Sequence, residues 1–307
     1  MTRAPTRAQS VSSLRSRGAP SATIATETAE QRSVNLSSLG QRAAFATHRA
    51  KVTDLVCAAA GGGGTARLCV LGAGNCNDLD LTRVARHYAE IHLVDIDGDA
   101  VATTIGRADK SARPHLRAHA PLDLSGILER LPRWKEMQVT PEELFACPAE
   151  CASAIASALP GPFEVVLSAC LLTQLQLSVL RGLTDQHPLF EAARQLTNLV
   201  HLRSMLRLLE KRGRGLLVTD ATSDQICEIE RFEQIERAAE RAAALLALGQ
   251  DGKLFYAVEP GLLQLTCRAD PELQLGVRLE PIRDAWLWRN GPQRTLLSYA
   301  LEFERLA

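Results

Sequence analysis

Short apolar runs and stretches with helical spacing alternate along most of the chain, a pattern that predicts an α/β fold. Residues 68–71 and 91–94 are mostly apolar runs of the kind found in buried strands. Between them, residues 80–90 place apolar side chains at helical spacing. The stretch 67–97 is therefore expected to fold as a β-α-β unit.

The two junctions of this unit carry residues suited to a ligand. Gly72 and Gly74 follow the first run, where their backbone can turn tightly and approach a bound molecule. Asp95 and Asp97 follow the second run. Backbone N–H groups at a helix start favour an anionic or polar ligand, and an acid after the second strand suits ribose hydroxyls. The unit thus predicts a site for a nucleotide-like molecule, with a helix N-cap as the alternative role for Asp95.

The pattern continues after this unit. A weaker third strand ends at Asp123, and Thr140-Pro141 should start a helix that runs to about residue 158. Residues 163–172 form a nearly unbroken apolar run, typical of a central parallel strand. A long helical region then leads to a fifth strand at 215–220, closing on Asp220, and residues 224–248 again have helical spacing.

The two ends of the chain differ from this middle part. Residues 1–33 are rich in Ser, Thr, Ala and Arg, as in a disordered tail or a transit peptide, and we favour the tail. Residues 34–64 predict a helical cap and a glycine linker. Near the C-terminus, Asn290-Gly291 joins two β-like runs and predicts a hairpin. We expect one domain over 34–307, with its cofactor-binding core at 65–220 and acceptor-side helices plus the hairpin at 221–307.

Composition narrows the class of partner. Lys+Arg and Asp+Glu balance at 35 each, which gives no indication of a nucleic-acid partner. The eight cysteines show no metal-ligand spacing, so no metal is expected. No apolar run has the length of a membrane span and no signal-peptide core is seen, so the cytoplasm is the expected location.

Taken in order, these elements resemble the class I S-adenosylmethionine-dependent methyltransferases from about residue 67 to the C-terminus. The resemblance implies a Rossmann-like, seven-stranded, mostly parallel sheet with a C-terminal antiparallel hairpin, helices on both faces and an N-terminal helical extension. It implies S-adenosyl-L-methionine as cofactor, with the methionine part over the glycine loop, the ribose on the acid after strand two and the adenine amino group at the acid after strand three. The implied cofactor-binding residues are Gly72, Ala73, Gly74, Asn75, Asp95, Ile96, Asp123, Leu124, Ser168 and Ala169.

The sequence departs from the family pattern at two positions. Cys76 stands where a third glycine is usual, and Val70 stands where an acid often precedes the glycines. The missing acid leaves one contact to the amino group of the cofactor to be replaced. Asn75 is the first candidate for this contact, ahead of Asn77 and Asp78.

Two other classes of function stay open. VLGAGN also begins several NAD(P)-dependent oxidoreductases, although that class favours a small residue at position 76 and does not predict Asp123. A cofactor-binding protein without turnover, acting as a partner subunit, is the other alternative.

Methyl transfer from a sulfonium is an in-line displacement that depends mainly on alignment, so no catalytic residue is identified. A base is needed only for an acceptor that must lose a proton; the positions to examine are Cys170, Thr173, Asp220 and Tyr256. The expected acceptor atom is an oxygen or nitrogen, a carboxylate included, of a small molecule, with a protein side chain second. Residues 35–59, 174–195 and 221–260 should build its site; they lack the basic-aromatic interleaving of nucleic-acid binders.

Overall fold

The computed structural model describes residues 21–62, 64–291 and 294–307. Its centre is an eight-stranded sheet in the order β3-β2-β1-β4-β5-β8-β6, with β7 paired to β8. The first five strands run parallel, and β8 runs antiparallel to β5, β6 and β7. The strands are β1 (Ala66–Leu71), β2 (Tyr88–Val94), β3 (Leu116–His119), β4 (Phe163–Ala169), β5 (Leu209–Ser223), β6 (Val277–Leu279), β7 (Ala285–Arg289) and β8 (Thr295–Arg305).

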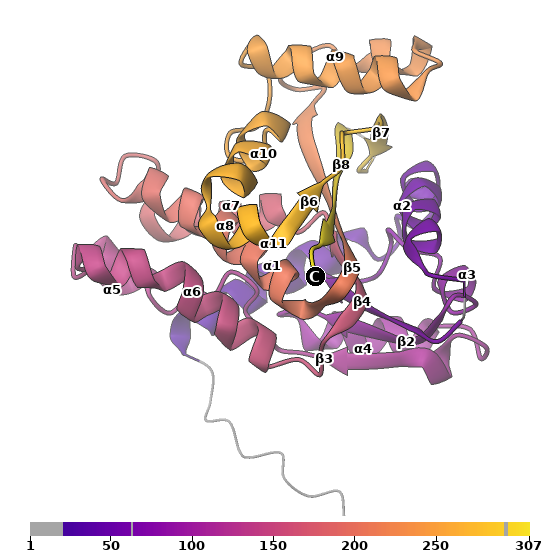
Figure 1. Ribbon diagram of the computed structural model, residues 1–307, viewed down its shortest axis with the longest axis horizontal. Coiled ribbons are helices and arrows are strands. Elements are labelled where there is room, and N and C mark those ends of the chain that lie inside the picture. Colours follow the sequence, from indigo (N-terminus) through magenta and orange to yellow (C-terminus); the bar gives the residue numbers. More distant parts are fainter. Residues whose placement is uncertain (1–20, 63, 292–293) are drawn as a thin grey trace, which may run out of the picture.

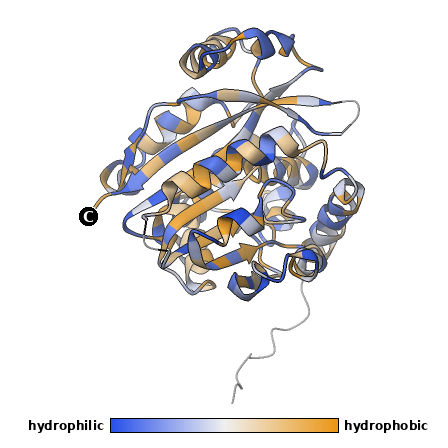
Figure 2. Ribbon diagram, turned by 90° about the vertical axis from the view of Figure 1, so that its right-hand side faces the viewer, coloured by the Kyte–Doolittle hydropathy of each residue, from blue (hydrophilic) through white to orange (hydrophobic). Residues whose placement is uncertain are grey.

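Helices cover both faces of this sheet (Figure 1). Alternate residues of β1 belong to two separate hydrophobic clusters: Cys69 and Leu71 to one, and Leu68 and Val70 to the other. The central strands are mostly apolar on both faces because both faces are buried. Figure 2 shows orange, hydrophobic segments along strands of the sheet. The helices are α1 (Ala22–Ser38), α2 (Ala46–Ala59), α3 (Leu81–Val84), α4 (Gly98–Arg107), α5 (Leu131–Lys135), α6 (Pro141–Ser157), α7 (Leu172–Leu183), α8 (Phe190–Leu208), α9 (Ala238–Gln250), α10 (Pro260–Ala269) and α11 (Pro271–Gly276), with 3-10 turns η1 (Arg113–His115) and η2 (Glu230–Gln234).

The expected α/β class, parallel core and terminal hairpin are confirmed, with eight strands in place of seven. The start of α6 is also as predicted: Thr140 Oγ1 accepts a 3.2 Å bond from the Glu143 N–H, and Pro141 occupies the first turn. None of the described helices is long and apolar enough to cross a membrane.

The N-terminal boundary was predicted wrongly in part. Helix α1 begins at Ala22, inside the stretch expected to be a disordered tail, and Ser21 caps it by accepting from the Ile24 N–H. Residues 1–20 of the expected tail lie outside the described part of the chain. The polar composition of α1 gives no local helix signal, because contacts to residues distant in the sequence hold this helix in place.

Several other boundaries differ from the sequence prediction, and the strands expected to end at 123 and 172 end at His119 and Ala169. The helix expected at 80–90 is the four-residue α3, because β2 already begins at Tyr88, whose hydroxyl donates a buried 2.6 Å bond to Val56 O. Strand β5 begins at Leu209 rather than 215, since this part pairs with Phe163 before an irregularity in the ladder. The helix expected from 224 starts only at Ala238, and α10, α11 and β6 were not predicted.

Candidate functional site

The glycine turn after β1 has the conformation that its sequence predicts. Gly72 and Gly74 have φ values of 75° and 45°, which favour glycine. A Cβ atom on Gly72 would lie 2.8 Å from Leu171 Cβ, and one on Gly74 would lie 2.9 Å from Asn35 Oδ1. The N–H groups of Gly72 and Ala73 donate to Val94 O at 2.9 and 3.0 Å, which fixes the turn to the end of β2.

Asp95 links this turn to the segment after β2. Its Oδ2 accepts a 2.8 Å bond from the Gly74 N–H, and its Oδ1 accepts one of 2.8 Å from the Asp97 N–H. Burial raises the pKa of Asp95 to about 6, against the opposing effect of these amide bonds. The ionised carboxylate retains lone pairs for further donors, such as hydroxyl groups.

The neighbouring Asp97 has the capping role considered for Asp95. Its Oδ1 accepts from the N–H groups of Asp99 and Ala100 at 3.2 and 3.3 Å, at the start of α4. Its Oδ2 accepts a 2.9 Å bond from the Asn35 amide of α1. The capping role therefore does not compete for the Asp95 carboxylate.

Asp123 organises the loop after β3. Its Oδ1 accepts from the backbone N–H and the hydroxyl of Ser125 at 2.8 and 2.7 Å, and its Oδ2 accepts from the Leu128 N–H at 3.3 Å. Burial raises the pKa of Asp123, while these bonds oppose the shift. Leu124, the next residue, is buried in the core.

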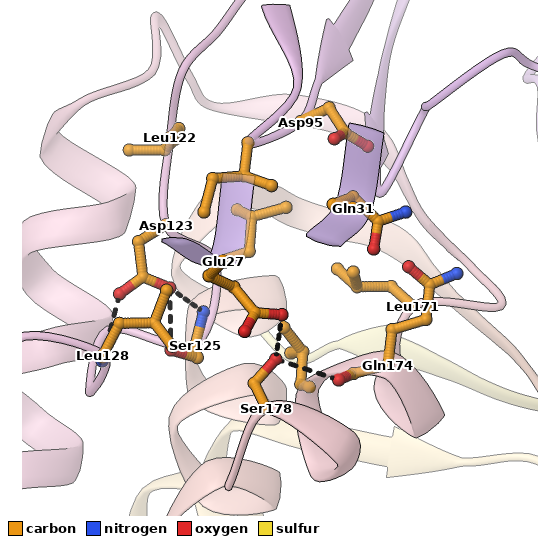
Figure 3. A pocket seen from close by; sticks show the side chains of 13 residues that line it. Glu27, Gln31, Asp95, Leu122, Asp123, Ser125, Leu128, Leu171, Gln174 and Ser178 are labelled. Carbon is orange, nitrogen blue, oxygen red and sulfur yellow. Dashed lines mark hydrogen bonds between the residues drawn. The ribbon is translucent and has the colours of Figure 1, made fainter. Parts of the chain in front are cut away.

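Asp95, Ile96, Asp123 and Leu124 are brought together in the wall of one hollow at the carboxyl edge of the sheet (Figure 3). This hollow is called the inner hollow below. Helices α1 and α7 form the part of the wall that faces these four residues. The remaining lining residues are Glu27, Gln31, Leu122, Ser125, Leu128, Leu171, Gln174, Leu175 and Ser178.

The part played by α1 was missed by sequence reasoning, which placed most of it in the tail. Glu27 accepts a 2.7 Å bond from the Ser178 hydroxyl and pairs with Arg181, both on α7. At the other end of the helix, the Asn75 amide donates to Asn35 O at 2.5 Å and to a serine hydroxyl at 3.0 Å. Helix α1 thus extends from α7 to the glycine turn. The available sequence signal was the capping serine at its start.

A second hollow adjoins the first, and Gln31 and Gln174 line both. It is called the outer hollow below. All four positions singled out for a possible base, Cys170, Thr173, Asp220 and Tyr256, lie in its wall. Its other lining residues include Val34, Leu177, Leu180, Phe190, Arg194, Phe255, Trp288 and Arg294.

Asp220 lies within β5, where it pairs with Ser298 of β8. The strand continues to Ser223, and the next helical turn starts only at Glu230, so Asp220 caps no helix. Asp220 is buried, and burial raises its pKa. It is therefore an acid in the outer hollow with no capping role.

Ser168 and Ala169 are placed differently from their neighbours in the predicted site. Both are buried at the end of β4 but lie outside the walls of the two hollows. The Ser168 hydroxyl is 2.8 Å from His201 Nε2, on the α8 side of the sheet. The next residue, Cys170, is the one that reaches the outer hollow.

Asp78, a half-buried acid near the glycine turn, is one of the three candidates for the contact that the missing early acid would make. Asp78 Oδ1 is buried without a hydrogen bond among the described residues and lies 3.4 Å from His48 Nε2. The Trp286 indole N–H donates to His48 Nδ1 at 3.0 Å, so a neutral His48 carries its proton on Nε2, facing Asp78. The amides of Asn75 and Asn77, the other two candidates, are bonded to α1 and its C-terminal Ser38.

Among the side chains that the structure describes, no group of three or more His, Cys, Asp or Glu is arranged to hold a metal ion. The polar groups of the two hollows are acids, amides, hydroxyls and arginines, together with the Cys170 thiol.

A sheet in this order, with an antiparallel strand inserted beside β5, a glycine turn after β1 and acids after β2 and β3, has the class I S-adenosylmethionine-dependent methyltransferase fold. No protein-family model and no curated protein matches the sequence. Among solved structures, the N-methyltransferase NodS from Bradyrhizobium japonicum WM9, in complex with S-adenosyl-L-homocysteine, is 10% identical, with a TM-score of 0.46, covering 92% of this chain and 98% of that chain. TnmH is 15% identical, with a TM-score of 0.45 and 92% and 60% covered. YcgJ from Bacillus subtilis is 11% identical, with a TM-score of 0.42 and 84% and 99% covered. These TM-scores lie below 0.5, so the fold assignment rests on the strand order and the turn geometry of this chain.

Proposed function

We propose that this chain is an S-adenosylmethionine-dependent methyltransferase that acts on a nitrogen or oxygen of a small molecule. The observation that carries the proposal is the pair of adjoining hollows that share Gln31 and Gln174. The inner one has the acids suited to a nucleoside, and the outer one has a buried acid and aromatic walls. Two adjoining sites are what a transfer between two bound molecules requires.

The residues of the inner hollow and glycine turn fit the cofactor. Asp95 would accept from the ribose hydroxyls, Asp123 from the adenine amino group, and Leu124 and Ile96 would bound the ring. The turn keeps its backbone free of side chains at Gly72 and Gly74. Ala73 and Asn75 belong to the same turn. Ser168 and Ala169 would not contact the cofactor and would support its site only through the packing of β4.

The amino group of the methionine part needs an acceptor, and Asp78 is the residue we assign to it. Its Oδ1 is buried and without a hydrogen bond among the described side chains. His48 would hold that carboxylate in place through Nε2, since Trp286 occupies Nδ1. A cationic ammonium group would supply the missing partner of this acid.

When bound, S-adenosyl-L-methionine would supply an electrophilic methyl group whose departure leaves a neutral sulfur. The chain would contribute alignment, exclusion of water beneath α1, and a proton acceptor. Asp220 is the candidate acceptor, because it is buried in the outer hollow and burial raises its pKa, which makes it a stronger base. Such an acid would take a proton from an N–H or O–H acceptor.

A ligand-shift melting experiment tests the proposal. S-adenosylhomocysteine should raise the melting temperature in a concentration-dependent way, and NAD(P) should leave it unchanged. Stabilisation by NAD(P) alone would instead support an oxidoreductase. A non-catalytic binding protein would bind S-adenosylhomocysteine but transfer no labelled methyl group from S-adenosylmethionine to any amine or hydroxyl compound in a broad panel. If the acceptor is instead a protein side chain, mass spectrometry would detect the methylated protein.

A further inference from the structure

The outer hollow contains cationic groups that the proposed transfer does not use. Arg194 lies on α8 with its guanidinium 4.4 Å from the centre of the Tyr256 ring and 5.2 Å from that of Phe190. Its Nε donates to the Gln176 side-chain oxygen at 3.0 Å, and its Nη2 donates to Tyr256 O. Both of these partners are neutral.

Other arginines on the same helix have acidic partners. Arg203 pairs with Asp270, and Arg207 pairs with Glu272, both through short contacts to α11. Within the described residues, neither Arg194 nor Arg294 forms an ion pair. Arg194 is half-buried, and a half-buried cation without a paired carboxylate is unfavourable unless a ligand completes it, whereas Arg294 is exposed. Burial lowers the pKa of Arg194, and the nearby Glu191 carboxylate opposes this shift without forming an ion pair.

Arg194 has N–H groups that no described protein group accepts from and that a ligand could use. A guanidinium has five N–H groups, and the two protein contacts use one on Nε and one on Nη2. The remaining donors include groups on both terminal nitrogens, which is the pattern that binds a carboxylate with two parallel hydrogen bonds. The indole N–H of Trp288, in the same wall, is buried and has no hydrogen-bond partner among the described residues.

The other side chains that line the outer hollow indicate that its ligand has an apolar body. Val34, Leu177, Leu180 and Tyr256 are exposed large side chains that line the hollow, with Phe190 and Phe255 beside them. Exposed apolar groups gathered at a concave surface are typical of a binding site. Asp220, by contrast, is buried in this hollow, and it would repel a carboxylate presented as the nucleophile.

Resting on the proposed function, we infer that the methyl acceptor is an amphipathic small molecule with an aromatic or apolar body, an amine or hydroxyl directed to Asp220, and a separate carboxylate bound by Arg194 with Arg294. The carboxylate is a recognition group and is not methylated. In the transfer, the bond from sulfur to methyl breaks, the nitrogen or oxygen forms the new bond, and its proton passes to Asp220. Arg194 is thus a specificity-determining residue that binds the acceptor.

A matched pair of probes tests this without turnover. Para-aminophenylbutyrate has the ring, the amine and the carboxylate, whereas para-butylaniline has a methyl group in place of the carboxylate. Calorimetric titration into the full chain, with and without S-adenosylhomocysteine, should show the carboxylate probe binding about tenfold more tightly, as expected for charge-assisted hydrogen bonds. Failure of S-adenosylhomocysteine to bind refutes the proposed function, while the probe ratio measured without it still decides the acceptor class.

Variants then assign the preference to residues. Arg194→Gln should remove most of the tenfold ratio. Arg294→Gln, at an exposed position, should reduce the ratio and leave the fold intact. Arg212→Gln is the control, because Arg212 has a side chain 84% exposed near the opposite end of β5. A reduced ratio in either test variant, with the control unchanged, supports the inference. Equal binding of the two probes, binding of neither, or an unchanged ratio in both variants overturns it.

Discussion

The Gly74 N–H donates a 2.8 Å hydrogen bond to Asp95 Oδ2, so the glycine turn and the acid after β2 form one unit. The same carboxylate accepts from the Asp97 N–H through its other oxygen. Asp95 therefore holds the turn in place and still borders the inner hollow. A change at this residue should affect both the shape of the site and the ligand that it binds.

Asp95→Asn should weaken S-adenosylhomocysteine binding at least tenfold and lower the melting temperature. The amide has one acceptor oxygen where the carboxylate has two, so one of the two backbone N–H groups loses its partner, at a cost of about 1–3 kcal/mol. Isothermal calorimetry and thermal melting measure the two effects. Asp99→Asn is the matched control, since the Asp99 side chain is 76% exposed and bonds only at the surface with Arg32. Unchanged affinity in Asp95→Asn would refute the ribose assignment.

Affinity for S-adenosylhomocysteine should also fall as the pH drops below about 6, because the pKa of Asp95 is raised to about 6 and protonation removes acceptor capacity. The effect on stability has the opposite sign. The folded-state pKa is above the ordinary value of 3.8, so ionisation of Asp95 costs folding free energy as the pH rises between about 4 and 6. Calorimetric titrations across this range test the first effect, and a pH-independent affinity would contradict it.

The sequence was most informative where one local segment defines the geometry. Gly72 and Gly74 require a particular backbone, and Asp95 follows an apolar strand directly, so chain order alone places these residues at one edge of a parallel sheet. Asp123 follows the same rule after the third strand. The hairpin could also be predicted from local sequence, because Asn290-Gly291 lies between two β-like runs.

The sequence was least informative where contacts are distant. Helix α1 has no buried apolar residue, and the Asn35–Asp97 hydrogen bond connects it to a segment 62 residues away. No local pattern predicts such a contact, so Glu27 and Gln31 were missed as wall residues. Likewise, no local pattern shows that the Asn75 side-chain N–H donates to α1 or that Asp78 has a buried oxygen without a hydrogen bond among the described residues.

Gly72→Ala should destabilise the protein by about 2 kcal/mol or more, through an unfavourable backbone conformation and a Cβ atom 2.8 Å from Leu171 Cβ. The melting temperature should fall by several degrees. Gly106→Ala is the matched control, because this glycine lies in α4 with no heavy atom within 4 Å of the added Cβ, and alanine there should be neutral or stabilising. Equal melting temperatures for the two variants would show that the turn tolerates a side chain.

Asp78→Asn should lower S-adenosylhomocysteine affinity about tenfold by removing the negative charge next to the cofactor amino group. Adenosine, which lacks that amino group, should bind the variant as it binds the unaltered protein. This difference separates loss of one contact from general damage to the site. His48→Gln should have a smaller effect in the same direction, since His48 Nε2 lies 3.4 Å from Asp78 Oδ1. A parallel loss of adenosine binding would contradict the assignment.

Asp220→Asn should leave S-adenosylhomocysteine binding intact and reduce kcat at least a hundredfold with an amine or hydroxyl acceptor, because the buried proton acceptor is lost. The loss should be smallest at high pH, where a larger fraction of the acceptor has already lost its proton to water. A pH profile of kcat for both proteins measures this, and Asp251→Asn, at a 59% exposed side chain, is the control for a change of one charge. If kcat is unchanged, or if it falls equally at every pH, then Asp220 does not accept the proton and its place in the outer hollow serves only to hold the acceptor.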